Sequence, residues 1–310
     1  MSGKADAGTP GLPWRPYATL ALVMLMWSGN FIVGRAVQGA IPPFTLALAR
    51  WSGAAALLLP FAWPHVRADR RVLAANWRIV LLLGLTGVAA FNALIYSGLR
   101  FTTASNGLLL QAAIPALVLL FDRTVFGQRF PALQVFAVLL SMVGVALIVL
   151  RGDPGAILGL TFNIGDLMIL AATACWAAYT SLLRLRPPCH PLVLLLATFA
   201  IGIAVMLPLS AWELAHGATI RVTPATVGAI VYVAVLPSLV AYILYNAAVR
   251  DLGAAAAGQT ITLLPLFGAL LAAALLDERL HAFHAVGMSA ILGGIVLGAL
   301  AGRRRVAEFP

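Results

Sequence analysis

The chain has 310 residues, of which 62% are hydrophobic and only 10% are charged. Soluble domains contain about 25% charged residues, so the composition excludes an ordinary soluble protein and predicts that lipid surrounds most of the chain. The formal net charge is +10. Nucleic-acid binding is nevertheless not indicated, because the arginines lie in short gaps between apolar runs and form no basic stripe with interleaved aromatics.

Ten apolar runs follow one another along the chain, and each is long enough to cross the roughly 30 Å hydrocarbon core of a bilayer as a helix. They lie at 17–36, 44–63, 78–97, 105–121, 132–150, 163–183, 191–212, 225–247, 255–276 and 283–301. Residues 1–16 predict a short tail rather than a cleaved signal peptide, and residues 302–310 predict a second, basic tail. The expected fold is therefore an all-α integral membrane protein.

The basic residues predict the orientation of the chain in the membrane. With the N-terminus in the cytoplasm, the inner segments hold 14 of the 20 Lys and Arg residues. An excess of positive charge is typical of cytoplasmic loops. Both tails are therefore expected in the cytoplasm.

The second half of the sequence repeats the first at an offset of about 149 residues. The matching residues are Trp27 and Trp176, Pro60 and Pro208, Trp63 and Trp212, Tyr96 and Tyr245, Pro115 and Pro265, and Gly144 and Gly294. Five spans per half is an odd number, so residues 17–150 and 163–301 are expected to form two inverted five-helix repeats around a central cavity. Inverted repeats are typical of transporters, whose site lies near the membrane midplane between the halves.

Pro115 and Pro265 lie well inside their spans. Proline removes a backbone hydrogen bond and clashes with the carbonyl four residues earlier, and in lipid the freed carbonyl needs a polar partner or a wet cavity. The pair predicts two kinked, cavity-lining helices in which the prolines act as hinges. A proline tolerated in a helix bundle is the alternative.

Aromatic and polar side chains inside the spans predict a binding cavity. Aromatic walls with hydrogen-bonding tips suit an organic solute that has an apolar side chain and polar ends. The expected substrate-binding residues are Trp27, Asn30, Asn92, Tyr96, Gln111, Trp176, Tyr179, Tyr245, Asn246 and Gln259. Tryptophans near the ends of spans are instead expected to form an interfacial belt; these are Trp14, Trp51, Trp63, Trp77 and Trp212.

The charged residues predict little ion chemistry within the membrane. The acidic residues fall in gaps and tails, except Asp166 near the start of a span, where a carboxylate suits the positive helix end. A proton relay therefore has no obvious carrier, and coupling through Asp166 is the alternative. Arg50 lies within a span, where it either snorkels to the outer surface or faces the cavity and meets a substrate carboxylate. His281 and His284 lack a third ligand, so no metal site is expected.

Several stretches share their order and spacing with a known group of proteins. They are Trp27-Ser28-Gly29-Asn30-Phe31, Trp176-Ala177-Ala178-Tyr179, Pro115, Pro265 and Leu276-Asp277-Glu278-Arg279-Leu280. Over about residues 17–301 the chain resembles the drug/metabolite transporter superfamily and, within it, the EamA family, most closely the YddG-type exporters of aromatic and other amino acids. The first repeat departs from the pattern with Gly127-Gln128-Arg129. The resemblance implies a bacterial inner-membrane exporter of amino acids that works by alternating access.

Other functions fit the residues less well. The main alternative is a proton-coupled carrier of another organic solute or drug. A sugar-phosphate carrier needs buried cations, and only Arg50 is available. A channel is less favoured, and an intramembrane enzyme lacks a recognisable catalytic motif. We therefore expect a transporter, not an enzyme, that acts as a monomer without a cofactor and whose partners are the bilayer and a small-molecule substrate.

Overall fold

The computed structural model describes residues 14–37, 39–102, 104–157, 163–275 and 279–308. Within these residues the chain is helical and forms no β-strand, which confirms the all-α prediction. Helices suit a chain in lipid because they satisfy the backbone hydrogen bonds within each segment. The Leu276-Asp277-Glu278 stretch quoted above lies outside the described residues.

The first half contains seven α-helices and two other helical segments. They are α1 (Trp14–Ala36), α2 (Pro43–Ala75), α3 (Trp77–Gly84), the π-helix η1 (Leu85–Ala90), α4 (Phe91–Gly98), α5 (Ala104–Gln111), α6 (Ile114–Phe126), α7 (Ala132–Val149) and the short 3₁₀ helix η2 (Pro154–Ile157).

The second half follows the same plan. Its elements are α8 (Ile164–Leu182), the 3₁₀ turn η3 (Leu183–Leu185), α9 (Pro191–Ala215), α10 (Pro224–Val233), the π-helix η4 (Ala234–Val240), α11 (Ala241–Leu252), α12 (Ala254–Thr260), α13 (Leu263–Leu275) and α14 (Ala282–Glu308).

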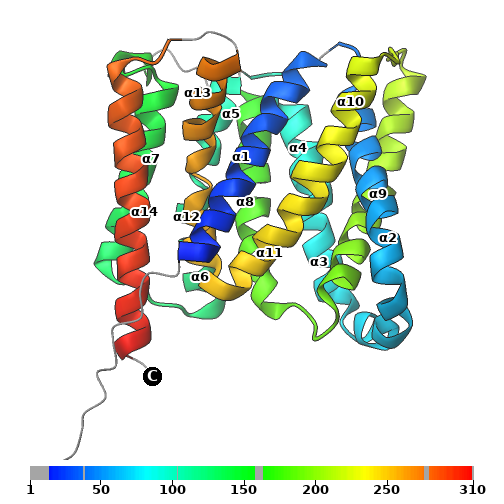
Figure 1. Ribbon diagram of the computed structural model, residues 1–310, viewed down its shortest axis with the longest axis horizontal. Helices are drawn as coiled ribbons and strands as arrows, with labels where there is room; N and C mark the ends of the chain where they lie inside the picture. The colour runs from blue at the N-terminus through cyan, green and yellow to red at the C-terminus, as the bar shows by residue number, and fades with distance from the viewer. Residues whose placement is uncertain (1–13, 38, 103, 158–162, 276–278, 309–310) are drawn as a thin grey trace, which may run out of the picture.

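Among the described residues, nine helical segments are long and apolar enough to cross a membrane, and α1, with 23 residues, runs through the same layer (Figure 1). Several of the helices extend beyond the predicted spans. Helix α1 begins at Trp14, α14 continues to Glu308, and α2 continues through Pro60 and Pro64 to Ala75. The gap predicted after residue 63 is therefore wrong, because the polar segment that follows extends the helix.

The two halves have opposite orientations. Helix α1 begins and α14 ends on the same side of the bundle, and the spans alternate in direction between them (Figure 1). The repeat-related helices α7 and α14 pack side by side and antiparallel. Gly144 allows their backbones to approach, since a Cβ on it would lie only 2.6 Å from the carbonyl oxygen of Gly287. Small residues at such crossings are typical of membrane helices.

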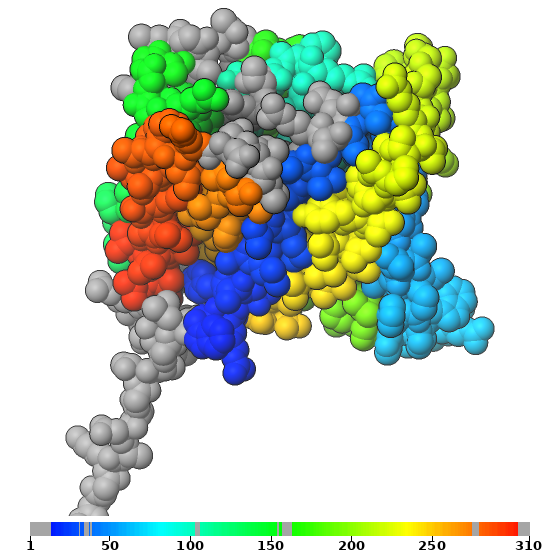
Figure 2. Space-filling view, turned by 45° about the horizontal axis from the view of Figure 1, so that its top comes forward, coloured from blue at the N-terminus to red at the C-terminus, as the bar shows by residue number. Residues whose placement is uncertain are grey.

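The first helix is inserted among helices of the second half. Figure 2 shows α1 (blue) at the surface between the orange α13 and the yellow α10, and α1 also packs against α11. One consequence is that the inner face of α1, which carries Trp27, lies against helices from the opposite repeat.

Four of the five tryptophans predicted for an interfacial belt are exposed on the bundle surface. Trp14, Trp63, Trp77 and Trp212 have between 50% and 67% of their surface accessible. The prediction for Trp51 is wrong, because its side chain is fully buried. It shares one face of α2 with the buried Ala47, Ala54 and Leu58, so helical register rather than distance from the span end decides its position.

Candidate functional site

Five aromatic side chains fill the centre of the bundle, and we call them the central aromatic cluster: Trp27 of α1, Trp176 and Tyr179 of α8, and Tyr242 and Tyr245 of α11. The rings of Trp27 and Trp176 meet edge to face, with centroids 5.1 Å apart and an interplanar angle of 87°. The Tyr245 ring lies 5.2 Å from Trp27. Such ring pairs contribute about 0.5–1.5 kcal/mol each beyond burial. The two repeat-related tryptophans therefore touch directly where the halves meet.

Further rings extend the cluster toward the outer helices. Phe91 of α4 lies 5.0 Å from Trp176. Trp51 of α2 lies 5.2 Å from Tyr242 and 4.9 Å from Phe199 of α9. The cluster is thus continuous with α2, α4 and α9, and its rings are in contact with one another in this structure.

Two π-helices pass beside the cluster and are related by the repeat. A π-helix leaves backbone carbonyls without their usual partners and is frequently found at functional sites. The indole Nε1 of Trp27 donates to the carbonyl oxygen of Pro237 in η4 at 2.9 Å. The hydroxyl of Tyr242 donates to the carbonyl oxygen of Gly87 in η1 at 2.7 Å. Side chains of the cluster therefore donate to one backbone carbonyl of each π-helix.

Polar groups line the cluster on the α8 and α11 side. The Tyr179 hydroxyl donates to Oδ1 of Asn246 at 2.7 Å, and the hydroxyl oxygens of Thr180 and Tyr245 lie 2.9 Å apart in a hydrogen bond. In the described part of the chain, the buried indole N–H of Trp176 makes no hydrogen bond of good geometry, although it interacts with the Tyr245 hydroxyl.

Three other predicted residues lie on helices that border the cluster. Asn30 is half-buried on α1, one turn beyond Trp27. Asn92 is buried on α4 and donates to the carbonyl oxygen of Val88 at 2.6 Å, so its amide nitrogen serves its own helix. Tyr96, one turn later, contacts Arg50. The side chain of Phe31 lies outside the described residues.

Gln111 and the two prolines lie at breaks in the fourth and ninth spans. Each span is interrupted just before its proline, at 112–113 and at 261–262, as the missing N–H of proline predicts. Gln111 and Pro265 line a cavity of about 10 Å³ between the two breaks, which is about the space one water needs. The hydroxyl of Ser28 in α1 shares its proton between the carbonyl oxygen of Leu264 at 3.0 Å and that of Met24 in its own helix at 2.8 Å. The role of the prolines as hinges stays a prediction.

Gln259 does not join the other predicted residues. Its Nε2 donates to the carbonyl oxygen of Gly294 at 2.8 Å and to Oγ of Ser141 at 3.3 Å. Its side chain is buried between α12 and the α7–α14 pair. These contacts fasten the ninth span to the helix pair beside it.

Arg50 is buried in the bundle, with 5% of its surface exposed, so the snorkelling alternative is wrong. Its Nε donates to Oγ of Ser238 at 2.8 Å, and Nη1 approaches the hydroxyl of Tyr96 at 3.4 Å. Ser238 belongs to η4 and Tyr96 to α4. The guanidinium therefore lies between the third and eighth spans, which contain the two π-helices and pass beside the central aromatic cluster.

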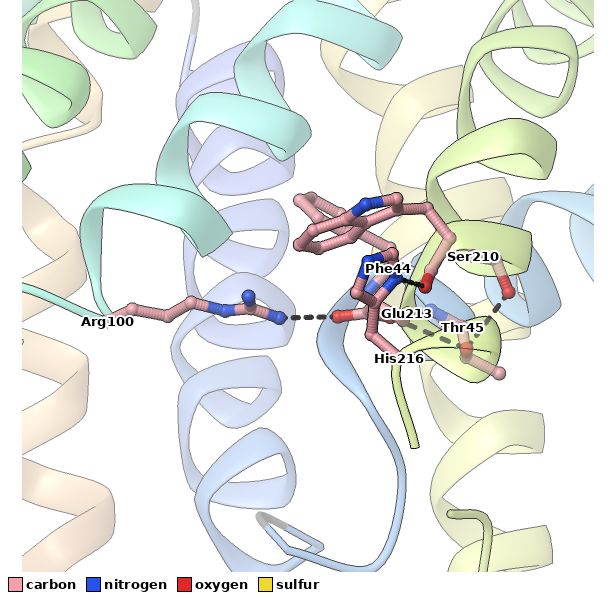
Figure 3. A network of polar contacts seen from close by, with 7 residues as sticks. Phe44, Thr45, Arg100, Ser210, Glu213 and His216 are labelled. Atoms are coloured by element: carbon pink, nitrogen blue, oxygen red, sulfur yellow. Dashed lines mark hydrogen bonds and ion pairs between the residues drawn. The ribbon is translucent and has the colours of Figure 1, made fainter. Parts of the chain in front are cut away.

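Glu213, near the end of α9, forms a second polar network, which Figure 3 shows from close by. It was expected in a gap, but it lies within the helix and is 3% exposed. Its Oε1 accepts from Nη2 of Arg100 at 2.6 Å, and its Oε2 accepts from the backbone N–H groups of Phe44 and Thr45 at 2.9 and 3.1 Å. A carboxylate at the first turn of α2 suits the positive end of that helix. The network joins α9, α2 and the turn that follows α4.

Two other carboxylates lie at helix ends. Asp122 of α6, also expected in a gap, is buried and paired with Arg184, while its Oδ1 has no partner in the part of the chain that is described. Asp166 caps the start of α8, where it accepts from the backbone N–H of Asn163 at 2.9 Å and from Oγ1 of Thr102 at 2.6 Å. The position predicted for Asp166 is confirmed.

Comparisons with known proteins agree with this architecture. The EamA-like transporter family matches residues 14–150 and again 163–299. An uncharacterized transporter of Archaeoglobus fulgidus is 30% identical over 287 residues, which cover 91% of this chain and 96% of that protein. A probable terminal-alkyne amino-acid exporter of Streptantibioticus cattleyicolor is 25% identical over 94% of this chain and 96% of its own. A crystal structure that is 20% identical in sequence superposes with a TM-score of 0.74 over 94% of this chain and 99% of that one, and so shares the fold. The chain belongs to the EamA-like transporter family of multi-pass membrane proteins.

Proposed function

We propose that this transporter exports amino acids, the aromatic and other apolar ones, and related metabolites across a bacterial inner membrane, by alternating access and without ion coupling. The observation that carries the proposal is the contact between Trp27 and Trp176 at the centre of the bundle. Their two helices come from opposite repeats, so a change in the relative position of the halves opens or closes the site between them. A site at such a repeat interface is typical of secondary transporters.

The chemistry of the site supports a solute with an apolar side chain and polar ends. Aromatic rings supply apolar contact, while the Trp176 indole and the Tyr179 and Tyr245 hydroxyls supply a few polar groups. The name of the amino-acid exporter from Streptantibioticus cattleyicolor supports the same class of solute. The family membership favours a transporter over an enzyme.

Two ion pairs at opposite sides of the bundle, each between a buried carboxylate and a partly exposed arginine, support alternating access. Glu213 and Arg100 pair near the end of α9, and Asp122 and Arg184 pair near the end of α6. Figure 1 places these helix ends on opposite sides. Opening one side of the carrier requires the ion pair on that side to separate while the other pair holds.

Flux into proteoliposomes that contain the purified protein tests the proposal. Labelled phenylalanine and leucine should enter with saturable kinetics, whereas choline and glucose 6-phosphate should not. Flux down a concentration gradient should persist when internal and external pH are equal. Flux that disappears without a pH difference would support the second candidate, a proton-coupled carrier, and an absence of saturable amino-acid flux would contradict the proposal.

The expected orientation is tested by labelling in intact cells. In a background without Cys175 and Cys189, the variant Arg129→Cys should resist a membrane-impermeant maleimide, whereas Arg221→Cys should react. The reverse pattern would contradict the proposal that both termini are cytoplasmic. Light scattering of the detergent-solubilised protein tests the expected monomer.

A further inference from the structure

Arg50 carries a charge that the rest of the described chain does not neutralise. The described ion pairs join Arg100 with Glu213, Arg184 with Asp122, and Arg250 with Asp251. Among the side chains that the structure describes, Arg50 is the only Lys or Arg that is buried. A buried cation without a counter-ion is costly in a membrane protein and typically marks a functional site.

The groups that surround the guanidinium are polar but neutral. Nε donates to Ser238, Nη1 approaches Tyr96, and Cζ lies 4.6 Å from the centroid of the Trp51 ring. A guanidinium has five N–H donors in a planar fork, and only two of its nitrogens are used in these contacts. Donors that match a planar, two-oxygen acceptor therefore remain.

Ser238 is held in place for its contact with Arg50. Its hydroxyl donates to the carbonyl oxygen of Val233 at 2.6 Å, so its oxygen is directed as the acceptor of the Arg50 N–H. The π-helix η4 thus fixes one side of the guanidinium, and the cation–π contact with Trp51 fixes a face. A positioned and desolvated arginine of this kind suits bidentate recognition of a carboxylate.

The guanidinium is also joined to the central aromatic cluster. The Trp51 ring lies 5.2 Å from the Tyr242 ring, which lies 6.0 Å from Trp27. Within the described residues, the buried indole N–H of Trp51 has no hydrogen-bond partner. Trp51 and Tyr242 are buried and in contact in this structure, so a solute with its anionic end at Arg50 and its apolar end among the rings requires these rings to move apart.

We propose that Arg50, positioned by Ser238 and Trp51, binds the carboxylate of the transported solute, so that the carrier selects organic monocarboxylates and rejects their decarboxylated counterparts. This inference rests on the proposed transport function and specifies its substrate class. The apolar part of the solute contacts the rings of Trp51 and Tyr242. The groups around Arg50 do not require an amino group on the solute, so both an amino acid and its deaminated acid should bind.

A comparison of matched solutes in proteoliposomes tests the inference. Initial rates are measured for labelled phenylalanine, 3-phenylpropionate and 2-phenylethylamine in the wild type, Arg50→Gln and Arg50→Lys. The wild type should carry the two carboxylates and discriminate against the amine. Arg50→Gln should lower the carboxylate rates about 10- to 100-fold, the range expected when a hydrogen bond to a charged group is lost, while Arg50→Lys should retain part of the preference. Arg78→Gln, an exposed arginine of α3, is the matched control and should keep wild-type rates.

The ratio of carboxylate rate to amine rate is the deciding quantity, because a loss of folded protein lowers both rates equally. A ratio that collapses in Arg50→Gln supports the inference. If the ratio is unchanged while both rates fall, Arg50 has a structural role and the inference is wrong. If the wild type carries phenylethylamine as well as phenylalanine, the substrate class is wrong but the transport function stands. If Arg50→Gln does not fold, Arg50→Lys and Ser238→Ala provide the same ratio.

Discussion

Arg50 and Trp51 of α2 occupy the positions at which α9, in the second half, carries Thr198 and Phe199, counted at the offset that pairs Pro60 with Pro208. The two aromatic residues are used alike, since their rings contact each other at 4.9 Å. Thr198 and Arg50, in contrast, differ in their contacts. Thr198 donates its hydroxyl to its own helix at 2.8 Å, whereas Arg50 reaches two other spans.

This comparison distinguishes two groups of residues: those that shape the backbone of both halves, which we call the frame, and those that contact the solute. Features of the backbone, such as the π-helices and the breaks before the prolines, occur in both halves, and the last helices of the two halves pack together as the antiparallel pair α7–α14. Each half has to pack against an inverted copy of itself. The charged side chains differ, because a small solute is not symmetric and needs a cation at one end only. Variants at equivalent positions of the two halves can therefore test whether a residue shapes the backbone or contacts the solute.

The largest effect is expected at Glu213, near the end of α9, whose counterpart in α2 is His65. Glu213→Ala leaves the N–H groups of Phe44 and Thr45 without their acceptor and Arg100 without its partner. The free energy of unfolding should fall by about 3 kcal/mol, since each unsatisfied buried group costs about 1–3 kcal/mol and the exposure of Arg100 reduces its share. Thermal unfolding in detergent measures this. His65→Ala removes only an exposed ring stacked on His190 and should change stability by less than about 0.5 kcal/mol; equal losses would contradict the assignment.

A smaller effect is expected at the π-helices, where Gly87 of η1 corresponds to Leu236 of η4. A Cβ on Gly87 would overlap the ring of Tyr179, whereas Leu236 is 36% exposed. Gly87→Ala should therefore lower stability by about 1–3 kcal/mol through overpacking and reduce flux. Gly228→Ala is the control, because a Cβ there meets nothing within 4 Å. A Gly87→Ala protein with wild-type stability would show that η1 does not pack against the cluster as described.

The smallest effect is expected at Ser28, whose counterpart in the second half is the buried Ala177. Ser28→Ala makes the two halves alike at this position. It removes a hydroxyl that shares its proton between the carbonyl of Met24 in its own helix, at 2.8 Å, and the carbonyl of Leu264 just before Pro265, at 3.0 Å. Stability should fall by about 1 kcal/mol, measurable as a shift of the midpoint of thermal unfolding. Ser289→Ala provides a control, since that hydroxyl bonds only its own helix at the surface. If the two variants lose the same amount of stability, Ser28 does not stabilise the interruption of the ninth span before Pro265.

The frame was largely predictable from the sequence, because hydrophobic length and repeat spacing report on the backbone. They predict the spans, the inversion, the breaks at Pro115 and Pro265, and the inward faces of Trp27 and Trp176. The π-helices were not predicted, since their apolar sequences do not distinguish them from the α-helices that they interrupt.

The polar part of the site was less predictable, because the position of a side chain within a span does not tell which way it faces. Trp51 and Glu213 lie near span ends, which favours an exposed position, yet both are buried because of the helical face on which they lie. For Arg50 the sequence fits both a side chain at the outer surface and one directed into the bundle. Gln259 has the right depth but faces α7 and α14.

The claim that the transport site lies where the two halves meet is tested most directly with four tryptophans. They form two repeat-related pairs in different places. Trp27 and Trp176 meet at the centre, whereas Trp63 and Trp212 lie on the surface, 62% and 50% exposed. The measurement is the rate at which each Trp→Ala variant, at equal amounts of folded protein, carries the solute that the wild type carries fastest. We predict a loss of about tenfold or more for the central pair and nearly wild-type rates for the surface pair. Wild-type rates in Trp27→Ala and Trp176→Ala, or equal losses in all four variants, would contradict a transport site where the halves meet.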